Sequence, residues 1–336
     1  MVGLPANEGF ASGESICVSY EVVPGAGEDS FALQTNGQGG YLCVADGCGG
    51  LGSKRYARLG ERTGAFLAAR LAVQEAERRL GSLFPLPETQ EAGRALCKTL
   101  AGHFSDRLRR FEAEHSAQRR IRIVGKMQRA LPTTLCLLLM ENTPRGLDCL
   151  FVWAGDSRGY VLDPRGLHQL TADHTNLRGD AMESLYRDVP LANLLSGEGE
   201  FFLSGRRVRL KEPCVALVAT DGTYACLQSP MEMEWLLLWT LHKAADLEGW
   251  KKRLHNQLVK LASDDCTLQL AVYGYRSFED LKASMEERRL ALQKLYITPV
   301  RRRKDDLNFA RDRWRAYMPD YDWTERTGQG EPDWRV

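Results

Sequence analysis

The sequence predicts an α+β protein in which strands and helices form separate layers. Short apolar or alternating runs, bounded by Gly, Asp, Asn or Pro, recur along the chain and are typical of strands. Two long amphipathic stretches lie together between the second and third of these runs, so helices and strands do not alternate one by one. Segregated elements of this kind favour a layered α+β architecture over a doubly wound sheet.

Seven segments have the pattern of strands, and each ends near a residue that favours turns. The predicted strands are 16–23, 41–45, 134–140, 150–154, 159–162, 215–219 and 267–273.

Apolar residues at helical spacing predict the helices. In the stretch 54–80 they include Phe66 and Leu71, and in the stretch 89–115 they include Leu100, Phe104 and Leu108. Further predicted helices cover 231–242, 247–261 and, from the apolar residues between Phe278 and Leu295, one amphipathic segment after residue 275.

The domain organisation follows from changes in composition along the chain. Residues 12–275 contain all the predicted strands, and 177–205 is a mixed polar segment with the character of a flap or a long loop. The segment 276–336 combines the amphipathic helix, the basic run 301–304 and an aromatic-rich tail with Trp314, Trp323 and Trp334. Such aromatics either dock on the parent domain or form a surface for a partner protein.

Composition excludes several classes of function. The 336 residues carry a formal net charge of +1, which gives no overall field favouring nucleic acid, and Asp305 and Asp306 directly follow the basic run. No run approaches the roughly 20 apolar residues that span a bilayer, so no membrane association is expected. The N-terminal residues lack a secretory pattern, and the nine cysteines are scattered without a CxxC pair, so a reducing cytoplasm is expected.

Acidic residues recur at the ends of the predicted strands, each beside glycine or another acid. They are Glu28–Asp29, Asp46, Asp156, Asp221 and Asp264–Asp265. One Asp-Gly pair alone is more typical of a turn. Five such sites are different, because clustered carboxylates repel one another and are costly to desolvate unless cations neutralise them. Carboxylate oxygens are the natural ligands of Mg²⁺ and Mn²⁺, so the pattern predicts a metal site.

The order of these motifs resembles that of the metal-dependent protein phosphatases of type 2C, in a bacterial form. The resemblance covers roughly residues 12–275, and the motifs that carry it are Glu28–Asp29, ADGCGG at 45–50, Thr133–Thr134–Leu135, AGDSRGYVL at 154–162, LTADH at 170–174, ATDG at 219–222 and SDDCTLQL at 263–270. It implies a central antiparallel β-sandwich flanked on both faces by helix pairs. It also implies a site for two Mn²⁺ or Mg²⁺ ions at one edge of the sandwich.

The resemblance implies a role for each matching residue. Asp46 would bridge the two ions, and Asp221 and Asp264 would hold the first. The Gly47 carbonyl and Glu28, through water, would hold the second. Asp156 would serve a weaker third position.

The implied chemistry is direct attack of a metal-activated hydroxide on phosphorus, without a phosphoenzyme. Cys48, beside the first Asp-Gly pair, is therefore not expected to act as a nucleophile.

The chain departs from the family pattern at the position of the arginine that binds the substrate phosphate, which is Pro24 here. Lys54, Arg55 or Arg58 could take over that role, although solvated helix charges are a common alternative. Cys48 stands where animal members often have histidine, and Ala225 stands where an acid often supports the third ion.

Three functions remain open at this point. The first is a Ser/Thr phosphoprotein phosphatase that opposes a cognate kinase. The second is a catalytically weak or inactive pseudophosphatase that binds phosphoproteins, which Pro24 favours. The third is a phosphatase of small phosphorylated metabolites.

Overall fold

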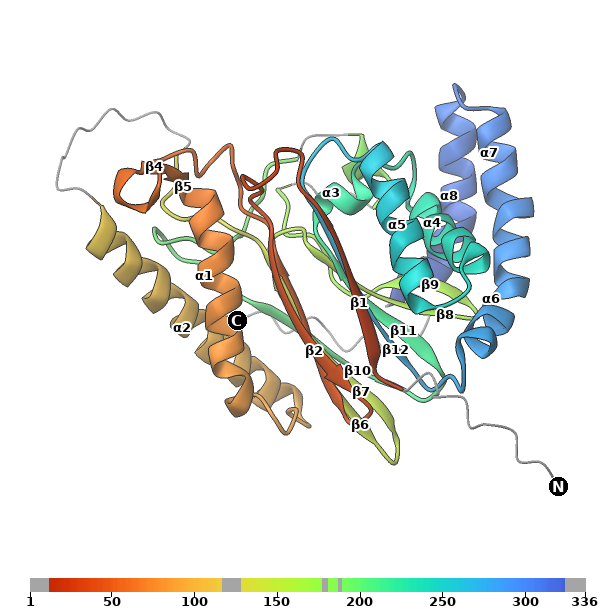
Figure 1. Ribbon diagram of the computed structural model, residues 1–336, viewed down its shortest axis with the longest axis horizontal. Coiled ribbons are helices and arrows are strands. Elements are labelled where there is room, and N and C mark those ends of the chain that lie inside the picture. The colour runs from red at the N-terminus through yellow and green to blue at the C-terminus, as the bar shows by residue number, and fades with distance from the viewer. Residues whose placement is uncertain (1–11, 117–127, 177–180, 187–188, 324–336) are drawn as a thin grey trace.

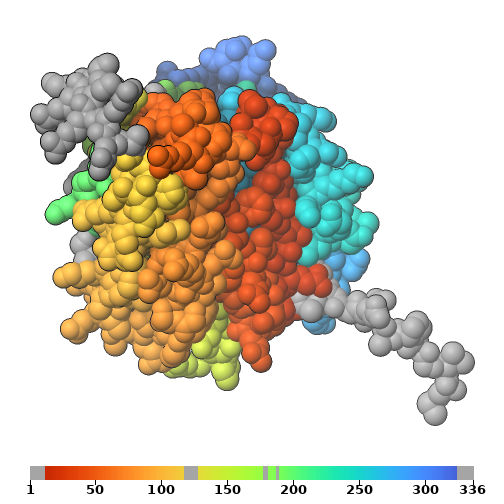
Figure 2. All heavy atoms as spheres, turned by 60° about the vertical axis from the view of Figure 1, so that its left-hand side comes forward, coloured from red at the N-terminus to blue at the C-terminus, as the bar shows by residue number. Residues whose placement is uncertain are grey.

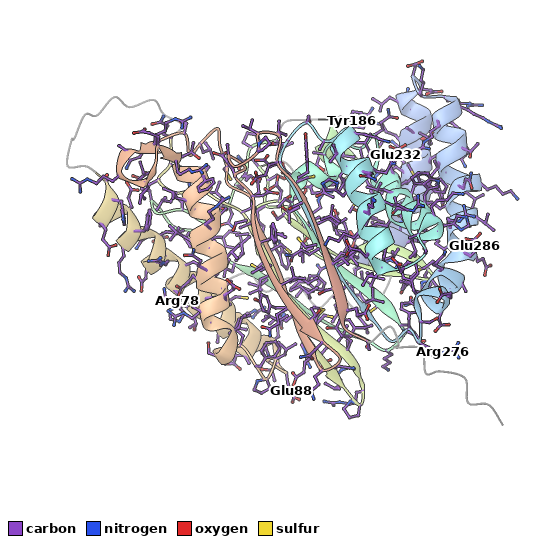
Figure 3. All side chains as sticks on the ribbon, viewed as in Figure 1. Arg78, Glu88, Tyr186, Glu232, Arg276 and Glu286 are labelled. Carbon is purple, nitrogen blue, oxygen red and sulfur yellow. The ribbon has the colours of Figure 1, made fainter. Side chains whose placement is uncertain are left out.

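The computed structural model describes residues 12–116, 128–176, 181–186 and 189–323. Two five-stranded antiparallel sheets pack face to face, and helices cover the outer face of each (Figure 1). Side chains fill the space between the sheets and beneath both helical layers (Figure 3). The predicted α+β fold class, a sandwich between two helical layers, is therefore confirmed.

The first sheet has the strand order β1-β12-β11-β8-β9. Its strands are β1 (Glu14–Tyr20), β12 (Cys266–Tyr273), β11 (Cys214–Ala219), β8 (Arg158–Asp163) and β9 (Gly166–Gln169). The second sheet has the order β10-β7-β6-β3-β2. Its strands are β10 (Ser204–Leu210), β7 (Gly146–Ala154), β6 (Leu135–Thr143), β3 (Gly39–Ala45) and β2 (Ser30–Asn36).

All seven predicted strands are present, but the other three strands of the sandwich lack a clear sequence pattern. β2, of seven residues, and β9, of four, are edge strands of mixed polarity. The arginines of β10 break the apolar pattern that would predict a strand. Asp148 of β7 neutralises two of them across the sheet. Arg207 and Arg209 donate to the Asp148 carboxylate at 2.8 and 2.5 Å. An edge strand with charged side chains is discouraged from pairing with other chains.

Two helices cover the second sheet and two cover the first. They are α1 (Gly64–Arg79) and α2 (Gln90–His115) on the former, and α4 (Pro230–Lys243) and α5 (Leu247–Leu261) on the latter. Side-chain caps fix three of the starting points, since the side chains of Thr63, Thr89 and Asp246 each accept a backbone N–H from the first helical turn.

The predicted helix 54–80 begins later than expected. Residues 55–63 instead form a two-stranded hairpin, β4 (Arg55–Tyr56) and β5 (Arg62–Thr63), around a short 3-10 turn at Ala57–Leu59. Gly60, with φ of +69°, ends that turn, and the αL conformation is one that glycine adopts without steric cost.

The predicted loop or flap at 177–205 is mostly irregular in the residues that are described, apart from a short 3-10 turn at Glu183–Leu185 and isolated bridges from Leu191 to Thr175 and from Leu195 to Thr133. Regular structure resumes when β10 begins at Ser204. Residues 177–180 and 187–188 lie outside the described ranges.

The C-terminal segment adds further helices, which pack on α4 and on β9 of the first sheet. It comprises α6 (Phe278–Leu292), a π-helical turn (Gln293–Ile297), α7 (Thr298–Arg302) and α8 (Leu307–Tyr321). The sequence pattern predicts α6 but not α8. Trp314, Tyr317 and Tyr321 of α8 are buried in the same apolar cluster as the outer face of the first sheet. Trp334 lies outside the described residues.

A buried carboxylate joins α8 and α6 to α4. Glu234 of α4 has no exposed surface, and Arg288 of α6 donates to both of its oxygens, at 2.6 and 2.9 Å. The hydroxyl of Tyr317 also donates to this carboxylate. The paired and hydrogen-bonded carboxylate thus links the three helices directly, and removing one partner would leave a buried charge uncompensated.

Candidate metal centre

The predicted acidic residues lie at one edge of the sandwich because of where the strands end. Asp46 directly follows β3 of the second sheet. Asp221 begins the short helix α3 (Asp221–Tyr224) after β11, and Asp264 precedes β12, both in the first sheet. The two sheets therefore each deliver carboxylates to the same edge, and α3 marks that edge at the top of Figure 1.

Asp46 is at the centre of this acidic cluster. Burial raises the pKa of Asp46 well above its usual range, and the charges of Asp221, Asp29, Asp156 and Asp264 raise it further. Burial likewise raises the pKa of Asp221, a shift that a hydrogen bond with Asp46 opposes. Side chains delivered from opposite sheets thus lie close enough for each carboxyl to shift the pKa of the other.

The other members of the cluster show the same electrostatic conflict. Burial, followed by the charge of Asp221, raises the pKa of Asp156 to about 8. Burial raises the pKa of Asp29 to about 7, even though Thr267 and Thr220 donate to one of its oxygens at 2.7 and 2.9 Å. The carboxyl groups lie deep among protein atoms, but each residue keeps part of its surface accessible to solvent.

Glu28 belongs to the loop between β1 and β2 and faces the same cluster. Burial raises its pKa, and the charges of Asp265 and Asp264 add to the effect. Thr63, at the start of α1, donates to one Glu28 oxygen. The other oxygen packs against Gly49, where a Cβ atom would lie only 2.2 Å from it. Glycine at this position therefore leaves room for the Glu28 carboxylate.

Backbone hydrogen bonds hold Asp46 and Gly47 in place. The Asp46 N–H donates to the Thr134 hydroxyl at 3.0 Å, and the Asp46 carbonyl accepts from the Thr133 hydroxyl at 2.7 Å. The Gly47 N–H donates to the Glu28 carbonyl at 3.3 Å. Thr133 and Thr134 thus anchor the end of β3.

Asp264 and Asp265 have different surroundings. Both oxygens of Asp265 accept backbone N–H groups of the β1–β2 loop, from Val22 and Glu28, each at 2.8 Å. Asp264 is exposed, and one of its oxygens accepts the N–H of Asp265 at 2.8 Å. The structure therefore commits Asp265 to the loop and leaves Asp264 beside Asp46 and Asp221.

The chemistry of these residues suits hard divalent cations, which prefer oxygen ligands. One oxygen of Asp29, Oδ1, is buried without a hydrogen-bond partner, and like-charged carboxyls crowd one another. However, no group of three or more His, Cys, Asp or Glu side chains in the described ranges stands in an arrangement that could hold a metal ion. The suitability of these acidic residues for divalent cations therefore rests on their oxygen donors and on their closeness to one another.

Two further side chains near the cluster, Arg158 and His174, have structural partners. Arg158 is buried and donates to both oxygens of Asp173, at 2.9 and 2.6 Å. His174 is buried between the rings of Trp153 and Phe202, and its Nε2 lies 2.9 Å from the Ser204 hydroxyl.

The cations predicted to bind substrate phosphate differ in availability. Lys54 pairs with Glu112 of α2 and donates to Ser116 at 3.0 Å, so its charge is already used. Arg58 is exposed on the 3-10 turn. Arg55 is exposed and donates to the Glu61 carbonyl at 2.8 Å, and its charge lowers the pKa of Glu28, which places it at the rim of the cluster.

Cys48 lies beside the cluster but does not have the properties of a nucleophile. Burial and the neighbouring charges, Asp46 first among them, raise the pKa of its thiol well above the usual range. A thiol that stays protonated is a poor nucleophile. We expect Cys48→Ala to keep phosphate-ester hydrolysis within about threefold of the wild-type rate, since only packing changes. A loss of activity comparable to that of a carboxylate variant, in the same assay, would contradict this.

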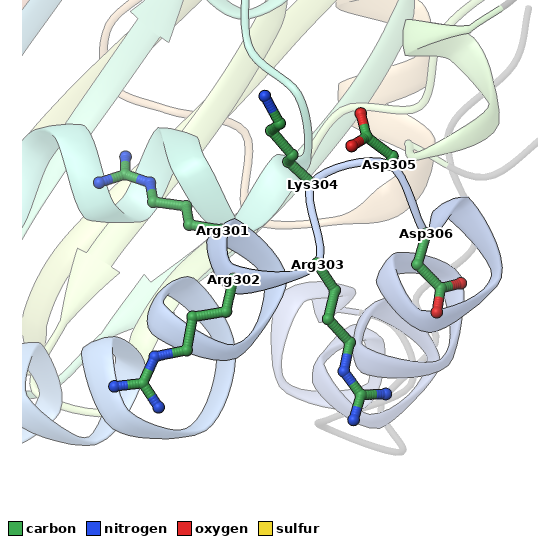
Figure 4. A pocket seen from close by; sticks show the side chains of 6 residues that line it. All are labelled: Arg301, Arg302, Arg303, Lys304, Asp305 and Asp306. Carbon is green, nitrogen blue, oxygen red and sulfur yellow. The ribbon is translucent and has the colours of Figure 1, made fainter.

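A separate pocket of about 500 Å³ lies at the turn between α7 and α8 (Figure 4). Its lining consists of residues 301–306 and includes no member of the acidic cluster. Arg301 donates to Glu232 of α4 at 3.2 Å, and Asp305 and Asp306 offset part of the positive charge. The basic run is thus a mixed-charge turn on the surface.

No helix among the described residues is long and apolar enough to cross a membrane. No protein-family model matches the sequence, and no curated protein is significantly similar to it.

Solved structures of bacterial phosphatases share the fold. A bacterial serine phosphatase is 18% identical, with a TM-score of 0.54 over 78% of this chain and 98% of its own. Serine/threonine phosphatase Stp1 from Staphylococcus aureus is 17% identical, with a TM-score of 0.54 over 82% of this chain and 100% of its own. The catalytic domain of the phosphatase PstP, in complex with two manganese ions, is 20% identical, with a TM-score of 0.51 over 79% of this chain and 100% of its own. The predicted resemblance is thus confirmed at the level of the fold.

Proposed function

We propose that this chain is a metal-dependent Ser/Thr phosphoprotein phosphatase. The observation that carries the proposal is the gathering of Asp46 and Asp221, delivered from opposite sheets, with further carboxyls whose charges raise one another's pKa values. Such a cluster is unfavourable by itself, because burial and repulsion both oppose its ionised form. Two divalent cations would neutralise it, and the fold is one that bacterial serine/threonine phosphatases share.

The chain offers an oxygen ligand for each position. Asp46, Asp221 and Asp264 would hold one Mn²⁺ or Mg²⁺ ion, and Asp46, the Gly47 carbonyl and, through water, Glu28 would hold a second. Asp156, whose pKa the charge of Asp221 raises, would serve a weaker third position.

The bound ions would supply hydroxide at neutral pH by lowering the pKa of water, and would offset negative charge on the phosphoryl group. The residues of the chain would bind these ions and hold the ligand groups in position. Thr133 and Thr134 hold the end of β3, Thr63 orients Glu28, and Asp265 fixes the loop that carries Glu28. No phosphoenzyme is needed, which agrees with the protonated thiol of Cys48.

A phosphoprotein substrate and a cognate Ser/Thr kinase as its counterpart complete the proposal, with signalling in a reducing bacterial cytoplasm as the setting. All nine cysteines are free, which suits that compartment. One observation favours the alternative of a pseudophosphatase that binds phosphoproteins without turnover: the exposed β1–β2 loop has Pro24, not a cation.

Hydrolysis of p-nitrophenyl phosphate and of a phosphothreonine peptide, with and without Mn²⁺, tests the proposal. We expect Mn²⁺-dependent turnover by the wild type and a loss on the order of 10²-fold or more in Asp264→Asn, because a ligand of the first ion is lost. Equal rates for the wild type and the variant would rule out the enzyme. Turnover confined to small esters would favour a metabolite phosphatase.

A further inference from the structure

Two arginines that the sequence motifs did not single out lie against the loop carrying Glu28. Arg62 is in β5, and its Nη1 donates to the Gly25 carbonyl. Arg70, on α1, donates from Nη2 to the Gly27 carbonyl at 3.1 Å. Both guanidinium groups contact the Phe66 ring, with Cζ 4.3 and 3.3 Å from its centroid. Figure 2 shows the loop, in red, beside the orange hairpin at the top of the molecule.

The two guanidinium groups differ in how many donors they have left. Both terminal nitrogens of Arg70 donate to backbone carbonyl oxygens: Nη2 to that of Gly27, and Nη1 to that of Phe66 at 3.0 Å. Arg62 is partly exposed, and among the residues that the structure describes, only the Gly25 carbonyl accepts one of its five N–H donors. Within the described part of the chain, neither arginine forms an ion pair with a carboxylate.

The position of Arg62 links it to the acidic cluster. Its neighbour in sequence, Thr63, donates to the Glu28 carboxylate, so the backbone of β5 borders the proposed centre. Gly25 follows Pro24, and the Arg62 guanidinium therefore lies beside the exposed turn of the β1–β2 loop. A guanidinium with free, forked donors and no carboxylate partner is suited to a dianionic phosphate group.

We propose that Arg62 binds the phosphoryl oxygens of the substrate, and that Arg70 and Phe66 position it. The inference rests on the proposed function and specifies its substrate-binding cation. The ligand is a phosphate monoester dianion, recognised by charge and by the planar fork of donors. Arg70 holds Phe66 and the loop, and the Phe66 ring supports the Arg62 side chain through a cation–π contact.

The test measures binding of inorganic phosphate to the full-length protein with Mn²⁺ by calorimetry, together with KM and kcat for a phosphothreonine peptide. The variants are Arg62→Gln, Arg62→Lys and, as a matched control, Arg94→Gln, an exposed arginine on α2. We expect Arg62→Gln to weaken phosphate binding on the order of 10- to 100-fold, as for a lost charge-assisted hydrogen bond. KM should rise while the Kd of Mn²⁺ stays unchanged, and Arg62→Lys should lie between the two.

The results that would overturn the role of Arg62 differ from those that would refute the proposed enzyme. Phosphate binding by Arg62→Gln equal to that of the wild type would overturn the inference. So would a parallel loss of Mn²⁺ affinity in Arg62→Gln and Arg62→Lys, since Arg62 would then only brace the loop. A wild type that binds phosphate through Arg62 but hydrolyses no ester would refute the enzyme and leave Arg62 as a phosphate-binding residue. If the wild type hydrolyses the ester but its phosphate affinity does not depend on Arg62, the proposed enzyme stands and the role of Arg62 in phosphate binding is refuted.

Discussion

Asp46→Asn should abolish metal-dependent hydrolysis and, at the same time, raise the melting temperature of the metal-free protein. Activity should fall on the order of 10³-fold, because metal-ion catalysis contributes several kcal/mol and each 1.36 kcal/mol is about tenfold in rate. The stability of the metal-free protein should instead increase. Asparagine keeps a donor toward Asp221 and removes the charge that the neighbouring carboxyls oppose.

Differential scanning fluorimetry with EDTA and with Mn²⁺ measures both halves of this prediction. The wild type should gain melting temperature on adding Mn²⁺, and Asp46→Asn should lose most of that gain, because a ligand stabilises only what binds it. Asp305→Asn, which neutralises an exposed carboxylate in the α7–α8 turn, is the matched control. A metal-free Asp46→Asn that melts lower than the wild type, yet keeps the full response to Mn²⁺, would show that the side chain is merely structural.

The stability of the metal-free protein should fall as the pH rises from about 5 to about 8. The pKa values of Asp29 and Asp156 rise from 3.8 to about 7 and about 8 in the folded protein. The folded state therefore binds more protons than the unfolded state in this window, and their contribution is lost as the pH passes the folded-state values. Carboxyls with lowered pKa values, such as Asp148, change their contribution to stability only below about pH 4, near their pKa in the unfolded chain. They therefore do not offset the expected loss of stability between about pH 5 and about pH 8.

Thermal or urea unfolding at pH 5.5, 7 and 8.5 in EDTA checks this dependence. Saturating Mn²⁺ should remove most of the decline, since the ions replace the protons that the carboxyls release. The double variant Asp29→Asn/Asp156→Asn should flatten the metal-free profile. Metal-free stability that increases steadily over the same range would contradict the assignment of an electrostatically strained cluster.

The fold was largely predictable because hydrophobic periodicity reports which face of an element is buried. The strands of the sandwich core are apolar runs, and α2 and α5 begin at or next to the predicted residues. Elements whose polarity is set by distant partners were not predictable. β10 depends on Asp148 of another strand, and α8 depends on Glu234, which lies far away in the sequence.

The candidate site shows the same division. Acids at strand ends are visible in the sequence, and their ordered motifs predicted a shared neighbourhood that includes Asp46, Asp221 and Asp264. The loop contacts of Asp265 could not be read from the sequence, because they depend on how the β1–β2 loop folds. The same holds for Arg62, whose significance arises only from the carbonyl and the ring it contacts. No local pattern distinguishes it from Arg55 or Arg58.

The central claim is that carboxylates from both sheets share divalent cations. Anomalous diffraction at the manganese edge, from crystals grown with Mn²⁺, tests it most directly. Two strong peaks are expected, both next to Asp46, one also next to Asp221 and Asp264 and the other next to the Gly47 carbonyl. Peaks located elsewhere, or an Asp46–Asp221 hydrogen bond that persists without any peak at saturating Mn²⁺, would contradict it.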